Sequence, residues 1–144
     1  MTEHLRTTHE IDRRSLGGVK RVRPDEIKQL RASSRAFAET ARLLAGMPDD
    51  RINRVASFCR DLNNCIDPIL NRMRANAYMV WIVGNRNVGG YPVPLNRIMS
   101  DFLRRRDCIK VANIRRRIPS KRMAIRNDVA PTMGRETILV FRKN

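Results

Sequence analysis

The chain has 144 residues, and 42% of them are hydrophobic, which is enough to bury the core of one domain. Its 30 Lys and Arg residues outnumber its 14 Asp and Glu residues, so nucleic acid is the first expected partner and an anionic membrane surface the second. The longest apolar run has about seven residues, far fewer than a spanning helix needs, and the N-terminus shows no signal pattern. The sequence therefore predicts a cytoplasmic protein that does not cross a membrane.

The cysteines and histidines show no pattern typical of a metal site. Cys59, Cys65 and Cys108 are an odd number without Cys-x-x-Cys spacing, and His4 and His9 have no acidic or thiol neighbour at ligand spacing. We therefore expect buried thiols in a reducing compartment and no bound metal.

The first half of the chain is expected to be an arm followed by helices. Residues 1–23 are polar and basic and keep neither a helical nor a strand period, so they predict a flexible N-terminal arm. Residues 24–76 predict a helical region. Apolar residues at spacings of three and four predict one helix over 24–45. Over 49–75 they predict either one helix bent at Pro68 or two abutting helices.

A strand rich in aromatic and branched residues follows. Residues 77–83 are all apolar, which predicts a strand covered on both faces and flanked by other strands, with Trp81 at its middle. The polar residues 84–87 then form a turn at the carboxyl end of the strand, where open α/β sheets bind their ligands.

The remaining elements alternate between helix and strand. The patterns predict a helix over 95–105, a strand over 108–118 with a bulge near Ala112-Asn113, a polar loop over 119–135 and a core strand over 136–142.

Positive charge is concentrated in one segment. Ten basic residues lie between Arg104 and Arg126, against the single acid Asp107. A solvated surface normally mixes both signs, so this segment favours a surface that contacts phosphate. Such contacts position a protein on DNA without reading its sequence.

Several motifs occur in a specific order over residues 78–142. They are Trp81-Ile-Val-Gly-Asn-Arg-Asn-Val, Val93-Pro94 before a helix, Arg115-Arg-Arg-Ile-Pro-Ser-Lys-Arg-Met and Glu136-Thr-Ile-Leu-Val. This order resembles the C-terminal half of site-specific DNA amino-methyltransferases. These enzymes use S-adenosylmethionine to methylate the exocyclic amino group of adenine or cytosine, often as part of restriction-modification systems.

The resemblance implies an α/β fold. It implies a partial Rossmann-like sheet of about three strands within residues 77–144, with the last strand antiparallel and between its two predecessors. It also implies that Asn85 and Arg86 line the substrate cleft, while the residues alone are equally compatible with a polar turn. The residues expected to contact DNA are Arg115, Arg117, Lys121, Arg122, Arg126 and Asn127.

The chain also departs from the family pattern. Ser120 replaces an Asn, Ala124 replaces a Pro, and no strand is followed by the Gly-x-Gly that cradles the cofactor. The Pro-Pro-aromatic motif that holds a flipped base is absent as well. In this family an acid, Ser or Asn precedes the two prolines. Asp67-Pro68 matches that acid and the first proline, but it lies inside a helical stripe, so we interpret it as a helix kink. No residue is predicted to be catalytic, and S-adenosylmethionine is expected in the parent family but not on this chain alone.

Three functions fit these patterns. The chain could be one subunit of a split DNA methyltransferase, with the cofactor half on a protein partner that docks on the edge and face of the strand over 77–83. It could be a truncated remnant that binds DNA without catalysis. It could instead be a basic adaptor of a protein or RNA assembly, using the apolar stripe of residues 24–75.

Overall fold

The helical half of the chain contains a break that the sequence patterns do not reveal. The computed structural model describes residues 10–19, 21–118 and 134–144. In it, α2 (Pro24–Ser33) and α3 (Arg35–Leu43) replace the single helix predicted over 24–45, and that prediction is wrong. Ser34 between them has φ −145° and ψ 120°, which is extended backbone. Its Oγ accepts from the Phe37 backbone N–H, so Ser34 starts a new helix as an N-cap.

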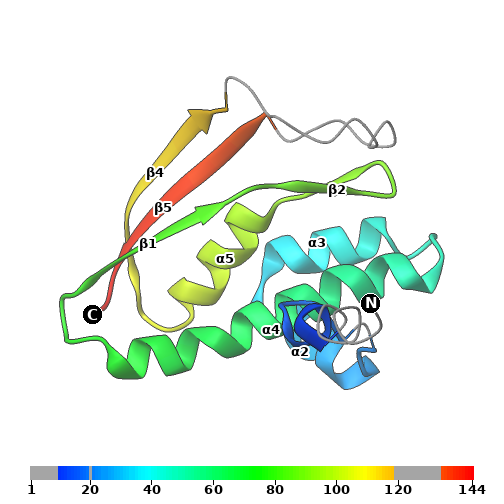
Figure 1. Cartoon of the computed structure of the whole chain (residues 1–144), viewed down its shortest axis with the longest axis horizontal. Coiled ribbons are helices and arrows are strands. Elements are labelled where there is room, and N and C mark those ends of the chain that lie inside the picture. The colour runs from blue at the N-terminus through cyan, green and yellow to red at the C-terminus, as the bar shows by residue number, and fades with distance from the viewer. Residues whose placement is uncertain (1–9, 20, 119–133) are drawn as a thin grey trace, which may run out of the picture.

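The next helix, α4 (Asp49–Arg72), runs without interruption past Pro68. It belongs to the helical layer with α2 and α3 (Figure 1). It contacts α2 and α5, and its apolar stripe is buried. Lys143 Nζ donates to the carbonyl oxygens of Leu70 and Met73 at 2.8 and 2.9 Å, which satisfies acceptors at the end of this helix.

The sheet has the strand order that the resemblance implies. Its strands are β1 (Tyr78–Val83), β4 (Ile109–Arg117) and β5 (Arg135–Arg142), in the order β1-β5-β4. The expectation that the last strand lies antiparallel between its two predecessors is confirmed. The predicted bulge is present, between Lys110 and Ala112. The protein is therefore a mixed α/β structure.

The position of β1 contradicts the prediction made for it. Among the described residues, β1 is an edge strand and not an interior one, because β5 is its neighbour on one side only. Its side chains alternate between the two faces of the sheet. Met79 points into the core, while Val80 and Ile82 are 60% and 63% exposed. The run over 77–83 is thus covered on one face, and the sequence could not distinguish this from cover on both.

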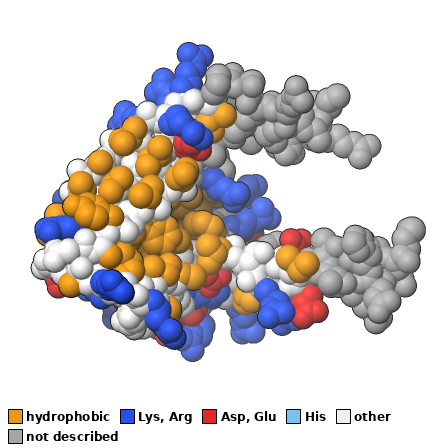
Figure 2. All heavy atoms as spheres, turned by 60° about the vertical axis from the view of Figure 1, so that its left-hand side comes forward, with side chains coloured by type: hydrophobic (Ala, Val, Ile, Leu, Met, Phe, Trp, Pro, Cys, Tyr) orange, Lys and Arg blue, Asp and Glu red, His pale blue; other side chains and the backbone are white. Residues whose placement is uncertain are grey.

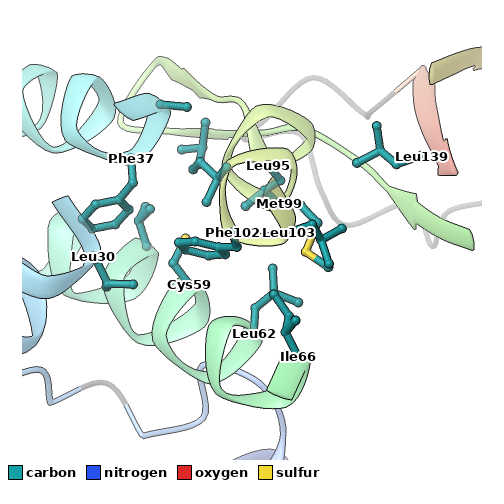
Figure 3. Packing of buried hydrophobic residues seen from close by; sticks show 14 of the residues in the cluster. Leu30, Phe37, Cys59, Leu62, Ile66, Leu95, Met99, Phe102, Leu103 and Leu139 are labelled. Carbon is teal, nitrogen blue, oxygen red and sulfur yellow. The ribbon is translucent and has the colours of Figure 1, made fainter. Parts of the chain in front are cut away.

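One amphipathic helix covers the inner face of the sheet. This helix, α5 (Leu95–Arg104), connects the sheet to the helical layer (Figure 1). Figure 3 shows Met99 and Phe102 of α5 among buried side chains that extend from Phe37 of α3 to Leu139 of β5. One continuous core therefore joins the helices to the sheet.

The segment predicted as a simple polar turn is a small hairpin. β2 (Arg86–Val88) pairs with β3 (Tyr91–Val93) in antiparallel register. Gly89 and Gly90 between them have φ of 59° and 83°, the left-handed region in which glycine is least strained.

The described part of the segment before α2 contacts α4. Arg60 donates to the carbonyl oxygens of Val19 and Arg21, and the Gly17 N–H donates to Asp61 Oδ2 at 2.8 Å. The flexibility predicted for residues 1–23 stays a prediction, since residues 1–9 and 20 lie outside the described part of the chain.

Candidate nucleic-acid interface

The described site residues lie at one end of the sheet. Val83, the last residue of β1, pairs with Thr137 of β5, and Thr137 pairs on its other side with Arg115 of β4. Two strand spacings, about 10 Å, therefore separate the β1 backbone at Val83 from the β4 backbone at Arg115. Asn85 and Arg86 directly follow this end of β1, so the sheet brings the polar turn and the basic strand together.

The three consecutive arginines of β4 do not share one face. Arg115 and Arg117 lie opposite Thr137 and Arg135, on the face of the sheet that α5 covers further along. Arg116 points to the other face, where it forms an ion pair with Glu136. Arg115 and Arg117 are exposed and have no ion pair with another described residue, so they can contact phosphate.

Two further arginines of the basic segment have structural roles. Arg105 donates to the Ala32 carbonyl oxygen at 3.1 Å and so holds the end of α2. Arg106 binds Asp67 and also donates to the Asn63 side chain at 2.9 Å. These partners lie on the helical layer. The basic segment is thus divided into arginines that stabilise the fold and arginines at the sheet end that face solvent.

Asn85 has a structural contact that the sequence did not reveal. Its Oδ1 accepts from the Asn96 backbone N–H at 3.3 Å, in the first turn of α5. The residue at the start of this helix, Pro94, provides no side-chain cap, so Asn85 supplies the missing acceptor from the end of β1. Arg86 is exposed in β2 and is the member of the pair that can reach a ligand.

Three buried polar atoms lack a hydrogen-bond partner among the described residues, and one of them, Glu136 Oε1, is within ion-pair distance of Arg116. The other two are Trp81 Nε1 on β1 and Asn96 Oδ1 on α5. A buried polar atom without a partner costs about 1–3 kcal/mol. Sequence reasoning missed both, because the signal is an absent partner and not a residue pattern.

Four of the predicted DNA-contacting residues cannot be assessed. Lys121, Arg122, Arg126 and Asn127 lie outside the residues that the structure describes. The roles predicted for them stay predictions.

The described residues show neither a metal-binding cluster nor a membrane-spanning helix. In residues 10–19, 21–118 and 134–144, no group of three His, Cys, Asp or Glu side chains could hold a metal ion. Over the same ranges, no helix is both long enough and apolar enough to cross a membrane.

The pKa of Asp67 lies below its ordinary value because Arg106 hydrogen-bonds to its carboxylate. This ion pair satisfies the acid of the Asp67-Pro68 pair within the fold.

Comparison with known proteins finds a distant similarity to a methyltransferase. Over 96 residues, 67% of the chain, it is 26% identical to the type II methyltransferase M.MvaI of Kocuria varians. The matched stretch covers 21% of that enzyme, about a fifth of its length. No protein-family model and no solved structure matches the chain. The similarity supports a methyltransferase-like relationship.

Proposed function

We propose that this chain is the DNA-binding portion or subunit of a split or truncated site-specific DNA methyltransferase. In this proposal it corresponds to the C-terminal half of a Rossmann-like amino-methyltransferase domain. The parent enzyme would transfer a methyl group from S-adenosylmethionine to the exocyclic amine of adenine or cytosine. This chain alone would bind DNA without catalysing the transfer.

The strand order is the observation that carries the proposal. β1 and β4 are both antiparallel to β5, so they run parallel to each other, with α5 as the connection between them and the last strand inserted in the middle. This is the arrangement that the motif order over 78–142 implies. The similarity to M.MvaI, a type II methyltransferase, supports the same relationship independently of the structure.

The charge at the sheet end supports DNA as the partner. Arg115 and Arg117 extend from one face of β4, close to the polar residues that follow β1. Together with the net charge of +16, they would bind the DNA backbone by releasing counterions. Arg86 is the proposed contact nearest the substrate cleft.

The proposal also requires a protein partner. The 144 residues contain no Gly-x-Gly after a strand and no Pro-Pro-aromatic motif, so the cofactor site and the catalytic loop would lie outside them, in this proposal on a protein partner. The outer edge of β1 is unpaired in the described part of the chain and would receive a strand of that partner. The stripe of residues 24–75 offers less support for an adaptor, because Phe37, Cys59 and Ile66 on it are fully buried.

Titration of a labelled DNA duplex with the full chain tests the proposal. If six phosphates are contacted, affinity should fall about a thousand-fold between about 50 and 200 mM salt. Calorimetry with S-adenosylmethionine should detect no binding to the chain alone. Methyl transfer to DNA should appear when a polypeptide carrying both missing motifs is co-expressed. DNA binding that is absent or insensitive to salt, or cofactor binding by the chain alone, would contradict the proposal.

A further inference from the structure

No described residue covers the outer face of the sheet, which is an apolar surface. We define the open face by Tyr78, Val80 and Ile82 of β1, Ile138 and Val140 of β5, and Ile114 of β4, which the strand register places on one side of the sheet. Figure 2 shows hydrophobic side chains gathered in rows over this part of the molecule. Its β1 residues and Ile114 are 52–63% exposed. Together they present an apolar area on the order of several hundred Å², the size that commonly marks an interaction site.

Arginines lie at both ends of the open face. Arg142, opposite Tyr78 in the strand register, lies at one end, and Arg116, whose charge is paired with that of Glu136, lies at the other. Figure 2 shows Lys and Arg side chains at the margins of the hydrophobic rows. An element that covers this face must therefore bring apolar side chains at its centre, and negative charge near Arg142 would stabilise it there.

The covered face of the same sheet indicates which kind of element fits. There, α5 packs against β4 and β5, and Met99 and Leu103 on the side of the helix nearer the sheet are fully buried (Figure 3). A helix is about 10 Å wide and spans roughly two strand spacings, so one helix matches the width of this three-stranded sheet.

The charge and the open edge exclude two other occupants. A second copy would bring another net charge of +16 and its own Arg142 against the charge already present, which is electrostatically unfavourable. A lipid surface would place the unpaired backbone edge of β1 in hydrocarbon, where nothing satisfies its N–H and C=O groups.

We propose that the open face of the sheet is a docking site for an amphipathic helix of a partner protein, with an apolar stripe flanked by Asp and Glu. This inference rests on the proposed function only in requiring a protein partner. It is independent of DNA binding and of methyl transfer.

Three synthetic peptides test the proposal with the full chain. The first is a helix with a leucine stripe flanked by glutamates, the second has lysine in place of every glutamate, and the third is a scramble of the first without a stripe. Fluorescence anisotropy should give at least about tenfold tighter binding for the first peptide than for either control.

Two substitutions localise the binding. Ile82→Glu should weaken the first peptide at least about tenfold, and the neutral Ile82→Asn should also weaken it, because the apolar contact is lost. Leu43→Glu adds the same charge at an exposed leucine of α3, away from the sheet, and should leave binding within about twofold. Circular dichroism checks that each variant is folded.

Four outcomes would overturn the inference. They are equal binding of the first and scrambled peptides, no binding of the first peptide, a dimer in sedimentation that Ile82→Glu disrupts, and flotation with anionic vesicles that Ile82→Glu abolishes. DNA titration of the same samples separates the two proposals. Lost DNA binding with intact peptide binding would contradict the proposed function alone, and the reverse would contradict this inference alone.

Discussion

Arg106, in the turn between α5 and β4, forms a two-point ion pair with Asp67 of α4, and its Nη2 lies 2.7 Å from Asp67 Oδ2. The pair joins the sheet to the helical layer across 39 residues of sequence. Asn63, one helical turn before Asp67, accepts a further bond from the same guanidinium at 2.9 Å. One arginine of the basic segment therefore orients the strand that carries Arg115 and Arg117.

Removing the charge of Asp67 should destabilise the fold modestly. Asp67→Asn should lower the free energy of unfolding by about 1 kcal/mol at neutral pH, because the carboxylate is largely exposed and solvent screens the pair. Urea denaturation of the variant and the unsubstituted chain measures the difference. An unchanged urea midpoint would show that the ion pair does not contribute to stability.

The same difference should depend on pH. The ion pair lowers the pKa of Asp67 in the folded state, so its stabilising effect is fully present above the unfolded-state value of about 3.9. It is lost as the pH falls through the lowered folded-state pKa. The stability gap to Asp67→Asn should therefore be constant from neutral pH to about pH 5 and shrink below about pH 4. If the stability difference between the two proteins persisted at the lowest pH, the ion pair of Asp67 with Arg106 would not be its cause.

The cysteines should differ sharply in reactivity. Burial raises the pKa of Cys59 to about 12 and also raises the pKa of Cys108, whereas Cys65 is exposed on α4. The thiolate is the reactive form. A short treatment of the native chain with iodoacetamide should therefore modify Cys65 first, and Cys59 only after unfolding. Peptide mass spectrometry identifies the modified positions, and early labelling of Cys59 would contradict its buried position.

Asn85 offers a test that separates a structural role from a ligand-binding one. Asn85→Ala removes the acceptor for the first turn of α5 and should cost about 0.5–1 kcal/mol of stability, whereas Asn85→Asp keeps the acceptor and should cost less. Thermal unfolding compares the variants. If Asn85→Ala left stability unchanged but weakened DNA binding, the residue would belong to the substrate cleft and not to the helix cap.

Much of the sheet was predictable because its determinants are local. The helix that became α5, the bulge before Ala112 and the last strand all follow from short periodic patterns. The hairpin of β2 and β3 also had a local signal, because Gly89-Gly90 separates two short segments that can pair as strands. The sequence analysis predicted only a polar turn there.

The features that were missed depend on distant contacts. Ser34 continues the spacing of the helical stripe. At the break between α2 and α3, its Oγ and the Ala36 backbone N–H both donate to Asp101, which lies far away in the sequence. The run that includes Val80 and Ile82 is apolar on both faces, and its sequence cannot tell which face the chain itself covers.

The candidate site was predictable only in part, for the same reason. Arg115 and Arg117 were chosen from a basic run, but the neighbouring Arg116 differs from them only because the strand register brings Glu136 opposite it. The strand register places Glu136 opposite Arg116, 20 residues away in the chain, and residue composition does not reveal the register.

The salt dependence of DNA binding tests the central claim most directly. The double variant Arg115→Gln with Arg117→Gln should weaken duplex binding and reduce the slope of log affinity against log salt by about 2, roughly 0.9 for each lost phosphate contact. The control is Arg14→Gln with Arg35→Gln, which removes the same charge from highly exposed helical arginines and should leave the slope unchanged. Equal slopes for the two double variants would contradict a DNA interface at this end of the sheet.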